Sequence, residues 1–140
     1  MQHSAGVSLR KFLAFLFLGL SLAAVNAHAS EGGGGGEGGG GAYTKLEPFT
    51  VNLVGLTQVI QLVVTLKMAK PEAGEKVKLY MPAVRHNMIL LLSSKSAEQV
   101  SSAAGKQKLI KETISTVNRA IESNAKEGVA DALFESIIIQ

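Results

Sequence analysis

The chain of 140 residues contains no cysteine and no tryptophan. Without cysteine it has no disulfide framework, no thiolate metal site and no cysteine nucleophile. The absence of cysteine does not indicate whether the protein resides in an oxidising or a reducing compartment, because a cysteine-free chain occurs on either side of a membrane. Histidine is scarce as well: His86 is the only one outside the N-terminal segment, and a single histidine cannot build a histidine metal site.

The chain also lacks a concentration of charge. Its formal net charge is +3. Arg10 and Lys11 carry two of these charges in a segment that we expect to be an export signal, so residues 30–140 retain 3 − 2 = +1. The basic residues are scattered rather than clustered, which argues against nucleic acid as a partner.

The N-terminal segment has the three parts of a secretory signal peptide. Two cations precede the apolar run FLAFLFLGLSLAAV (12–25), and Ala27 and Ala29 occupy the small-residue positions of a cleavage site. We expect cleavage between Ala29 and Ser30. An uncleaved membrane anchor over residues 1–29 is the alternative, although fourteen helical residues cover only about 21 Å of the roughly 30 Å hydrocarbon core. No cysteine follows the run, which excludes a lipoprotein.

A glycine tract follows at residues 31–41, with nine glycines and two glutamates. A phosphate-binding glycine loop needs a strand before it and a helix after it, and neither is expected here. Such a tract behaves as flexible coil with an end-to-end distance of roughly 17–20 Å. We therefore interpret residues 30–42 as a flexible linker leading to one folded domain at 43–140.

Alternating apolar residues predict two strands at the start of this domain. The predicted core positions are Phe49, Val51 and Leu53 in the first strand and Ile60, Leu62, Val64, Leu66 and Met68 in the second. Gly55 to Thr57 should form the turn between them. The opposite face of the second strand includes Val59 and Val63 and is only half polar. It is either an interface with another subunit or covered by the domain's own helices.

Helical spacing begins after KPEAGEK (70–76). One apolar stripe comprises Val77, Met81, Val84, Met88 and Leu91, with Pro82 at a start or a kink. The run MILLLSS (88–94) should be buried on all sides, and Ser96 with Gln99 fits a capping box. A second long helix places these residues on one face: Leu109, Ile110, Ile114, Val117 and Ile121. Lys106, Lys111, Glu112, Arg119 and Glu122 should be solvated.

The β-branched end of the chain predicts a returning strand. Its faces should be Leu133, Ile137 and Ile139 on one side and Phe134 and Ile138 on the other. The expected fold is therefore α+β, a single small domain with an antiparallel-type sheet and two helices.

Each candidate catalytic motif in the sequence lacks a residue that its chemistry requires. Gly105-Lys106 resembles the end of a Walker loop, but Val100 and Gln107 stand where glycine and serine or threonine are required. Ser93 and Ser94 adjoin Lys95, yet Leu92 occupies the serine position of an S-x-x-K motif. His86, beside Arg85, should lie on the surface. We expect no enzymatic activity, metal, cofactor or small-molecule substrate.

The folded part resembles the FliL family of flagellar basal-body-associated proteins. The resemblance is carried by PFTVNL, QVIQLVVTLKM, MPAVRHNMILLLSSKSAEQVSSAAGKQKLIKETISTVN and GVADALFESIIIQ. Its most specific residues are Arg85, the apolar run into Ser93-Ser94-Lys95, and Gly105-Lys106 opening a helix.

The resemblance implies a periplasmic domain similar to the stomatin/prohibitin fold, held at the inner membrane. Such domains assemble into a ring around the stator and support flagellar rotation, motility and chemotactic swimming. FliL proteins usually keep a full-length transmembrane helix, whereas this apolar run is short and ends in a cleavage site. The alternative function is a periplasmic binding or scaffold module unrelated to flagella, and an exported hydrolase is a third.

Overall fold

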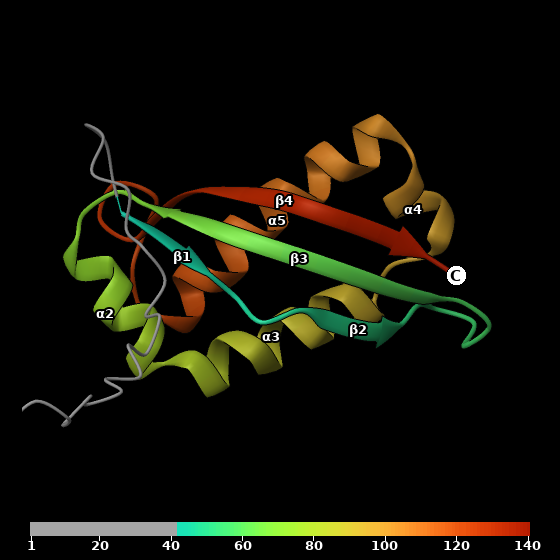
Figure 1. Ribbon diagram of the computed structural model, residues 1–140, viewed down its shortest axis with the longest axis horizontal. Coiled ribbons are helices and arrows are strands. Elements are labelled where there is room, and N and C mark those ends of the chain that lie inside the picture. The colour runs from blue at the N-terminus through green and yellow to red at the C-terminus, as the bar shows by residue number, and fades with distance from the viewer. Residues whose placement is uncertain (1–41) are drawn as a thin grey trace, which may run out of the picture. The chain divides into compact units, whose positions relative to one another are not determined.

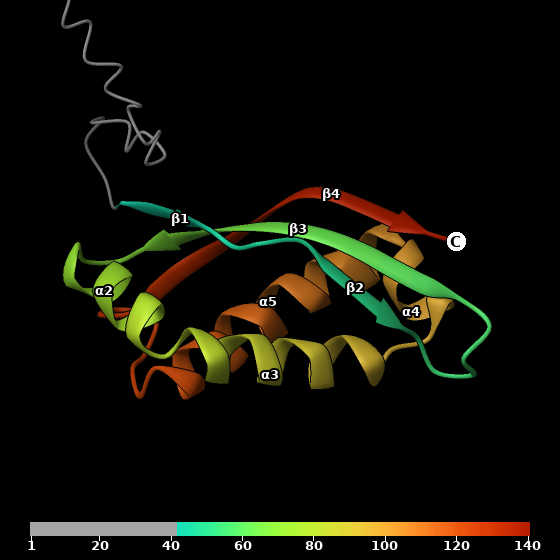
Figure 2. The same ribbon diagram turned by 60° about the horizontal axis from the view of Figure 1, so that its bottom comes forward.

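The computed structural model describes residues 42–140. In order along the chain, the elements are β1 (Tyr43–Lys45), β2 (Phe49–Asn52), β3 (Val59–Met68), α2 (Glu72–Leu79), α3 (Met81–Ser93), α4 (Ala97–Ser101), α5 (Ala103–Ala120) and β4 (Val129–Ile139). The strands form one antiparallel sheet and the helices lie against one of its faces (Figures 1 and 2). The predicted α+β fold is confirmed, but the described part forms four helices rather than two.

Strand β3 is the centre of the sheet. It pairs with β4 over its whole length on one side, and with β1 and then β2 on the other. The short strand β1 was not predicted, because Tyr43–Lys45 shows no alternation of apolar residues. The turn between β2 and β3 lies where it was predicted, with Gly55 at a φ of 94°.

The predicted core faces of β2 and β3 are confirmed. Every predicted apolar position in these two strands is buried. The intervening residues of β3 are exposed or half-buried, as a two-residue period requires. The sheet therefore packs one face onto α3 and α5 and turns the other away from them (Figure 2).

The predicted faces of the last strand are wrong in part. Val63 pairs with Ser136 and Val64 with Phe134, so Glu135 is an extra, bulged residue. A bulge shifts the alternation by one position. Phe134 therefore joins Ile137 and Ile139 on the core side, while Leu133 is exposed on the outer face with Ile138.

The predicted stripe around Pro82 is divided between two helices. Helix α2 ends at Leu79 and α3 begins at Met81, with Pro82 in its first turn, where a missing N–H is tolerated. The buried side of α3 consists of Val84, Met88 and Leu92, whereas Leu91 is only partly buried. The expectation that residues 88–94 are buried on all sides is wrong. Ile89 and Leu90 are exposed on the side of α3 that has no layer over it.

The predicted capping box at the start of α4 is confirmed, since Ser96 and Gln99 exchange side-chain hydrogen bonds with each other's backbone. Leu109 and Val117 of α5 and Ile121 at its C-cap are buried, while Ile110 and Ile114 are partly buried against the core. The polar residues Thr113 and Asn118 are buried as well, which the apolar pattern did not predict.

Asn118 fastens the end of α5 to the start of β4. Its Nδ2 donates to the carbonyl of Val129 and its Oδ1 accepts from the N–H of Val129, both at 2.8 Å. A Cβ on Gly128 would lie 2.2 Å from Oδ1, so the position before β4 must be glycine for this contact to form. The amide thus sets where β4 starts and, through it, the register of β4 on β3.

We predict that Asn118→Ala lowers the free energy of unfolding by about 2–4 kcal/mol, because both backbone groups of buried Val129 lose their partner. The control is Asn87→Ala, which removes one bond to the carbonyl of Ala83 within the same helix and should cost less than about 1 kcal/mol. Urea unfolding followed by circular dichroism measures both. Equal losses in the two variants would show that Asn118 does not hold β4 in place.

Candidate functional site on the uncovered face of the sheet

The sequence-predicted motif residues lie in separate parts of the domain. The guanidinium of Arg85 stacks 4.7 Å from the ring centroid of Phe49, and Nη1 donates to the carbonyl of Glu47 at 3.2 Å. Arg85 therefore joins α3 to the start of β2. Its neighbour His86 is exposed, as predicted.

The hydroxyls of Ser93 and Ser94 donate to carbonyls one turn earlier in α3, at 3.1 and 2.6 Å. They close the helix rather than face a substrate. The backbone carbonyl of the next residue, Lys95, accepts a hydrogen bond from the N–H of Val54 at 2.9 Å, which joins this end of α3 to the β2–β3 turn.

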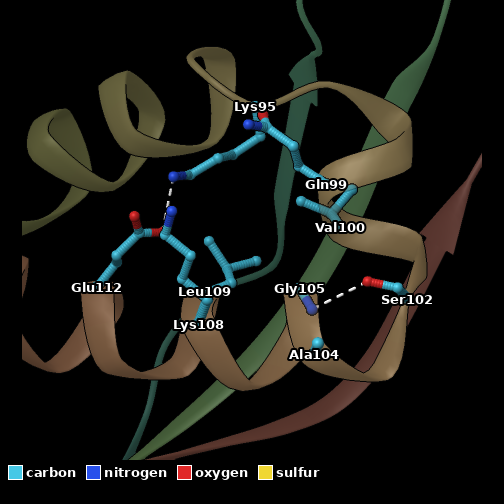
Figure 3. Close-up of a pocket in the computed structure, with 9 residues that line it drawn as sticks. All are labelled: Lys95, Gln99, Val100, Ser102, Ala104, Gly105, Lys108, Leu109 and Glu112. Atoms are coloured by element: carbon cyan, nitrogen blue, oxygen red, sulfur yellow. Dashed lines mark hydrogen bonds and ion pairs between the residues drawn. The ribbon is translucent and has the colours of Figure 1, made fainter.

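The side chain of Lys95 forms an ion pair with Glu112, with 2.7 Å between Nζ and Oε2. Both side chains are largely buried, 14% and 29% exposed, so the expectation of a solvated Glu112 is wrong. The pair borders a pocket of about 230 Å³ between α4 and α5 (Figure 3). Gly105 lines the same pocket, and a Cβ there would lie 1.8 Å from the carbonyl oxygen of Gln99. Glycine at this position lets α4 and α5 meet.

Lys106, the last motif residue, does not join this group. It lies in a groove between α5 and β4. The sequence-predicted motif is therefore dispersed over three contacts in the fold, and the structure does not bring its members together into one site.

The two predicted interface residues, Val59 and Val63, lie on the outer face of β3 and are half-buried. No helix of residues 42–140 covers this face; the helices lie on the other side (Figure 2). Of the two alternatives left open by the sequence, cover by the helices of the described domain is therefore wrong.

Neighbouring strands extend the apolar character of this outer face. Ile138 pairs with Gln61, between Val59 and Val63 along β3, and Leu133 pairs with Thr65. Ile138 is 46% exposed, Leu133 42% and Tyr43 of β1 50%. An antiparallel sheet that only faces water carries polar residues on that side. We define the uncovered face as Tyr43, Val59, Val63, Leu133 and Ile138. The bulge in β4, which was not visible in the sequence, placed Leu133 on it.

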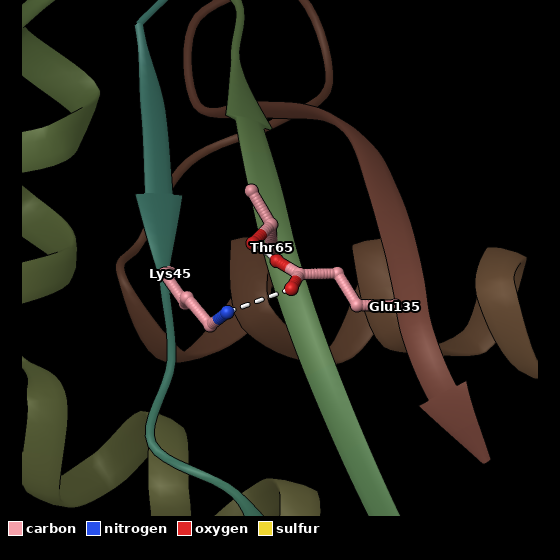
Figure 4. Close-up of polar contacts among 3 residues, drawn as sticks. All are labelled: Lys45, Thr65 and Glu135. Atoms are coloured by element: carbon pink, nitrogen blue, oxygen red, sulfur yellow. Dashed lines mark hydrogen bonds and ion pairs between the residues drawn. The ribbon is translucent and has the colours of Figure 1, made fainter. Parts of the chain in front are cut away.

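A polar contact crosses the middle of the uncovered face (Figure 4). Lys45 of β1 forms an ion pair with the bulged Glu135 of β4, with 2.7 Å between Nζ and Oε2. The hydroxyl of Thr65, on β3, donates to the other carboxylate oxygen. The hydrogen bond from Lys45, and then that from Thr65, lower the pKa of Glu135 below its ordinary value of 4.5. Three strands are thus joined across the face by one carboxylate.

The described residues contain no group of three or more histidines, cysteines, aspartates or glutamates that could hold a metal ion. None of the helices described for residues 42–140 is long and apolar enough to span a membrane. The predicted cleavage position, Ala29 and Ser30, lies outside the described residues.

Comparison with known proteins gives a match over the whole folded part. Residues 43–140 match the sequence model of the family described as flagellar basal body-associated protein FliL. The chain is similar to Flagellar protein FliL of Escherichia coli (strain K12), with 29% identity over 96 residues, or 68% of this chain and 62% of that protein. It is also similar to Flagellar protein FliL of Aquifex aeolicus (strain VF5), with 27% identity over 95 residues, or 66% and 57%. The match therefore spans less than two thirds of each relative's length.

We predict that the ion pair at Glu135 makes stability depend on pH. Because folding lowers the pKa of this carboxyl, its contribution is fully present above the unfolded pKa, near 4.5, and is lost as the pH falls through the folded pKa. The difference in unfolding free energy between the wild type and Glu135→Gln should be constant above about pH 6 and shrink below about pH 4.5. Glu47→Gln, at an exposed residue outside the ion pairs of the described chain, is the control. A difference for Glu135→Gln that stays constant down to about pH 3, well below the unfolded pKa at which the loss begins, would contradict the assignment.

Proposed function

The chain belongs to the FliL family of flagellar basal body-associated proteins, and from this premise we propose that it is a non-enzymatic component of the flagellar basal body. In this proposal residues 43–140 form a periplasmic domain at the inner membrane. The domain assembles into a homo-oligomeric ring beside the stator and supports flagellar rotation, motility and chemotactic swimming. No nucleic acid or small-molecule substrate takes part.

The single observation that carries the assembly part of the proposal is the uncovered face. Its five residues lie on three strands of one sheet, and three of them are between 42% and 50% exposed. Burying apolar surface of this kind stabilises association by roughly 25 cal/mol per Å². The polar contact of Lys45, Thr65 and Glu135 between them supplies the directional groups that a specific interface also needs.

The motif residues support a non-enzymatic role. A catalytic motif brings nucleophile, base and orienting group within hydrogen-bond reach of one another. Here Arg85, Lys95 and Gly105 instead contact Phe49, Glu112 and the backbone of Gln99 in separate places. These contacts hold the helices against the sheet, so we assign the family motif a role in stabilising the fold.

In this proposal the N-terminal residues bring the domain to the periplasmic side of the inner membrane. Residues 1–29 act as signal peptide or membrane anchor, and residues 30–42 act as a flexible tether to the domain. The glycine tract at 31–41 within it has eleven residues and would reach about 35–40 Å if fully extended. With residues 1–29 retained as the anchor, a ring held by such tethers adjusts its height above the membrane to that of its partner. The alternative is a periplasmic scaffold with the same face that acts away from flagella.

We predict that a charge on the uncovered face weakens self-association and leaves the fold intact. In Val63→Lys the ammonium would have to lose water on assembly, whereas in the monomer it points to solvent beside Ser136. Light scattering over a concentration series should show a lower mean mass than for the wild type. Ser115→Lys, at an exposed position on α5, is the matched control and should assemble normally. If Val63→Lys has a native circular dichroism spectrum and assembles like the wild type, the uncovered face is not the self-association interface.

The flagellar assignment is tested separately by deleting the gene. We expect the deletion strain to swim more slowly than the wild type in medium of raised viscosity, because a stator-supporting protein matters most at high load. Flagella should still be present by electron microscopy. If the deletion strain and the wild type swim at equal speed at every viscosity, the flagellar role is contradicted and the scaffold alternative is favoured.

A further inference from the structure

A cyclic ring of more than two copies needs two different contact surfaces on each copy. A surface that binds only itself is satisfied once a pair has formed, whereas a ring grows by head-to-tail contacts between unlike surfaces. In the proposed function the uncovered face is one of these surfaces. The surface of the neighbouring copy that it binds must therefore lie elsewhere on the same domain.

Large apolar side chains outside the uncovered face are exposed mainly at two places in the described domain. Val54 and Leu56 are 60% and 80% exposed at the tip of the β2–β3 turn. On α3, Ile89 and Leu90 are 42% and 54% exposed, and Leu79, just before this helix, is 75% exposed. The turn offers two side chains at one end of the sheet, which is too little to cover a face that spans three strands. Helix α3 is the larger candidate.

Helix α3 turns an uncharged side away from the core. Arg85 is the only lysine, arginine, aspartate or glutamate in this helix. It is held against the ring of Phe49 and the carbonyl of Glu47. The exposed residues recur at helical spacing, opposite the buried Val84 and Met88. We define the outer side of α3 as these exposed residues: Pro82, His86, Ile89, Leu90 and Ser93.

The other long helices have a different exposed side. A surface helix that faces water carries charged and polar residues on the side away from the core. Helix α2 exposes Glu75 and Lys78, and α5 exposes Lys108 and Lys111. No element of residues 42–140 lies over the outer side of α3 (Figure 2). Its composition is therefore that of a contact surface, although nothing in the described domain contacts it.

The outer side of α3 and the uncovered face match in position and length. They lie on opposite sides of the two-layer domain (Figure 2). Helix α3 has 13 residues and is about 20 Å long, and the outer face of β3 from Val59 to Thr65 also spans about 20 Å. Sheets are commonly covered by helices on both faces. One copy can therefore bring its α3 onto the open sheet of the next.

We propose that the outer side of α3 is the surface of the neighbouring copy that the uncovered face binds. The apolar side chains of both surfaces leave water together. Lys45 and Glu135, which already pair with each other, need no charged partner on α3. Each copy then uses its sheet toward one neighbour and α3 toward the other, and the contacts close into a ring when the rotation between copies divides a full turn. The inference rests on the proposed function, because it names the partner surface of the same interface.

Mixing two charged variants tests whether the surfaces are unlike. Val63→Lys alters the uncovered face and Leu90→Lys the outer side of α3. Each variant alone should fall to the mass of a monomer in light scattering, because each lacks one surface. An equal mixture should reach the mass of a dimer and grow no further, since the intact sheet of Leu90→Lys binds the intact α3 of Val63→Lys. Ser115→Lys alone should assemble like the wild type.

Crosslinking locates the contact, because the chain has no cysteine of its own. One tagged chain carries a single cysteine on β3, at Gln61 or Val63, and a second chain of different size carries one on α3, at Ile89 or Leu90. Packed layers lie about 10 Å apart, so a bismaleimide of about that length joins cysteines that face each other. Mixed pairs should give a crosslinked heterodimer several-fold above pairs made with Ser115→Cys. Circular dichroism confirms that each variant is folded.

Other outcomes separate this inference from the proposed function. A homodimer of Val63→Cys without a mixed product would show that sheet meets sheet, which overturns α3 as the partner surface and keeps the uncovered face as the interface. Normal assembly of a folded Leu90→Lys, or an assembled wild type whose β3 cysteines never crosslink to α3, would also overturn α3. A wild type that stays monomeric at every concentration would contradict the proposed ring, and this inference with it.

Discussion

The pairing of β3 with β4 is the interaction on which the rest of the structure depends. It joins the middle of the folded chain to its last strand over ten residues of β3. One face of the pair holds the core, and the other forms the uncovered face. Asn118 sets where β4 begins, and the bulge at Glu135 sets which of its side chains point outward. A shift of one residue would exchange core and surface along the whole strand, so the register determines which residues form the core and which form the uncovered face.

The family motif is explained by this arrangement. Arg85 joins α3 to β2 through Phe49, Lys95 joins the end of α3 both to α5 and to the β2–β3 turn, and Gly105 allows α4 and α5 to touch. Each contact holds a helix in position beneath the sheet. The motif residues therefore maintain the fold. The uncovered face lies on the other side of the sheet from the helices that these residues hold.

Periodicity alone predicted the parts of the fold that obey a single period. The alternation in β3, the capping box at Ser96 and the turn at Gly55 are as predicted. The predictions that were wrong or missing concern features that depend on contacts between residues far apart in the sequence. The bulge at Glu135 arises from its pairing with β3, and the burial of Asn118 and Glu112 from their partners Val129 and Lys95. Of the candidate site, Val59 and Val63 were predictable from alternation. Leu133 was not, because only the bulge places it on their side.

We propose that the uncovered face is the surface through which this protein acts at the flagellar basal body. Complementation of the deletion strain tests it most directly, with swimming speed measured in viscous medium at matched protein levels. The wild-type chain and Ser115→Lys should restore speed, and Val63→Lys should not. Full restoration by Val63→Lys would contradict the claim and place the functional surface elsewhere on the domain.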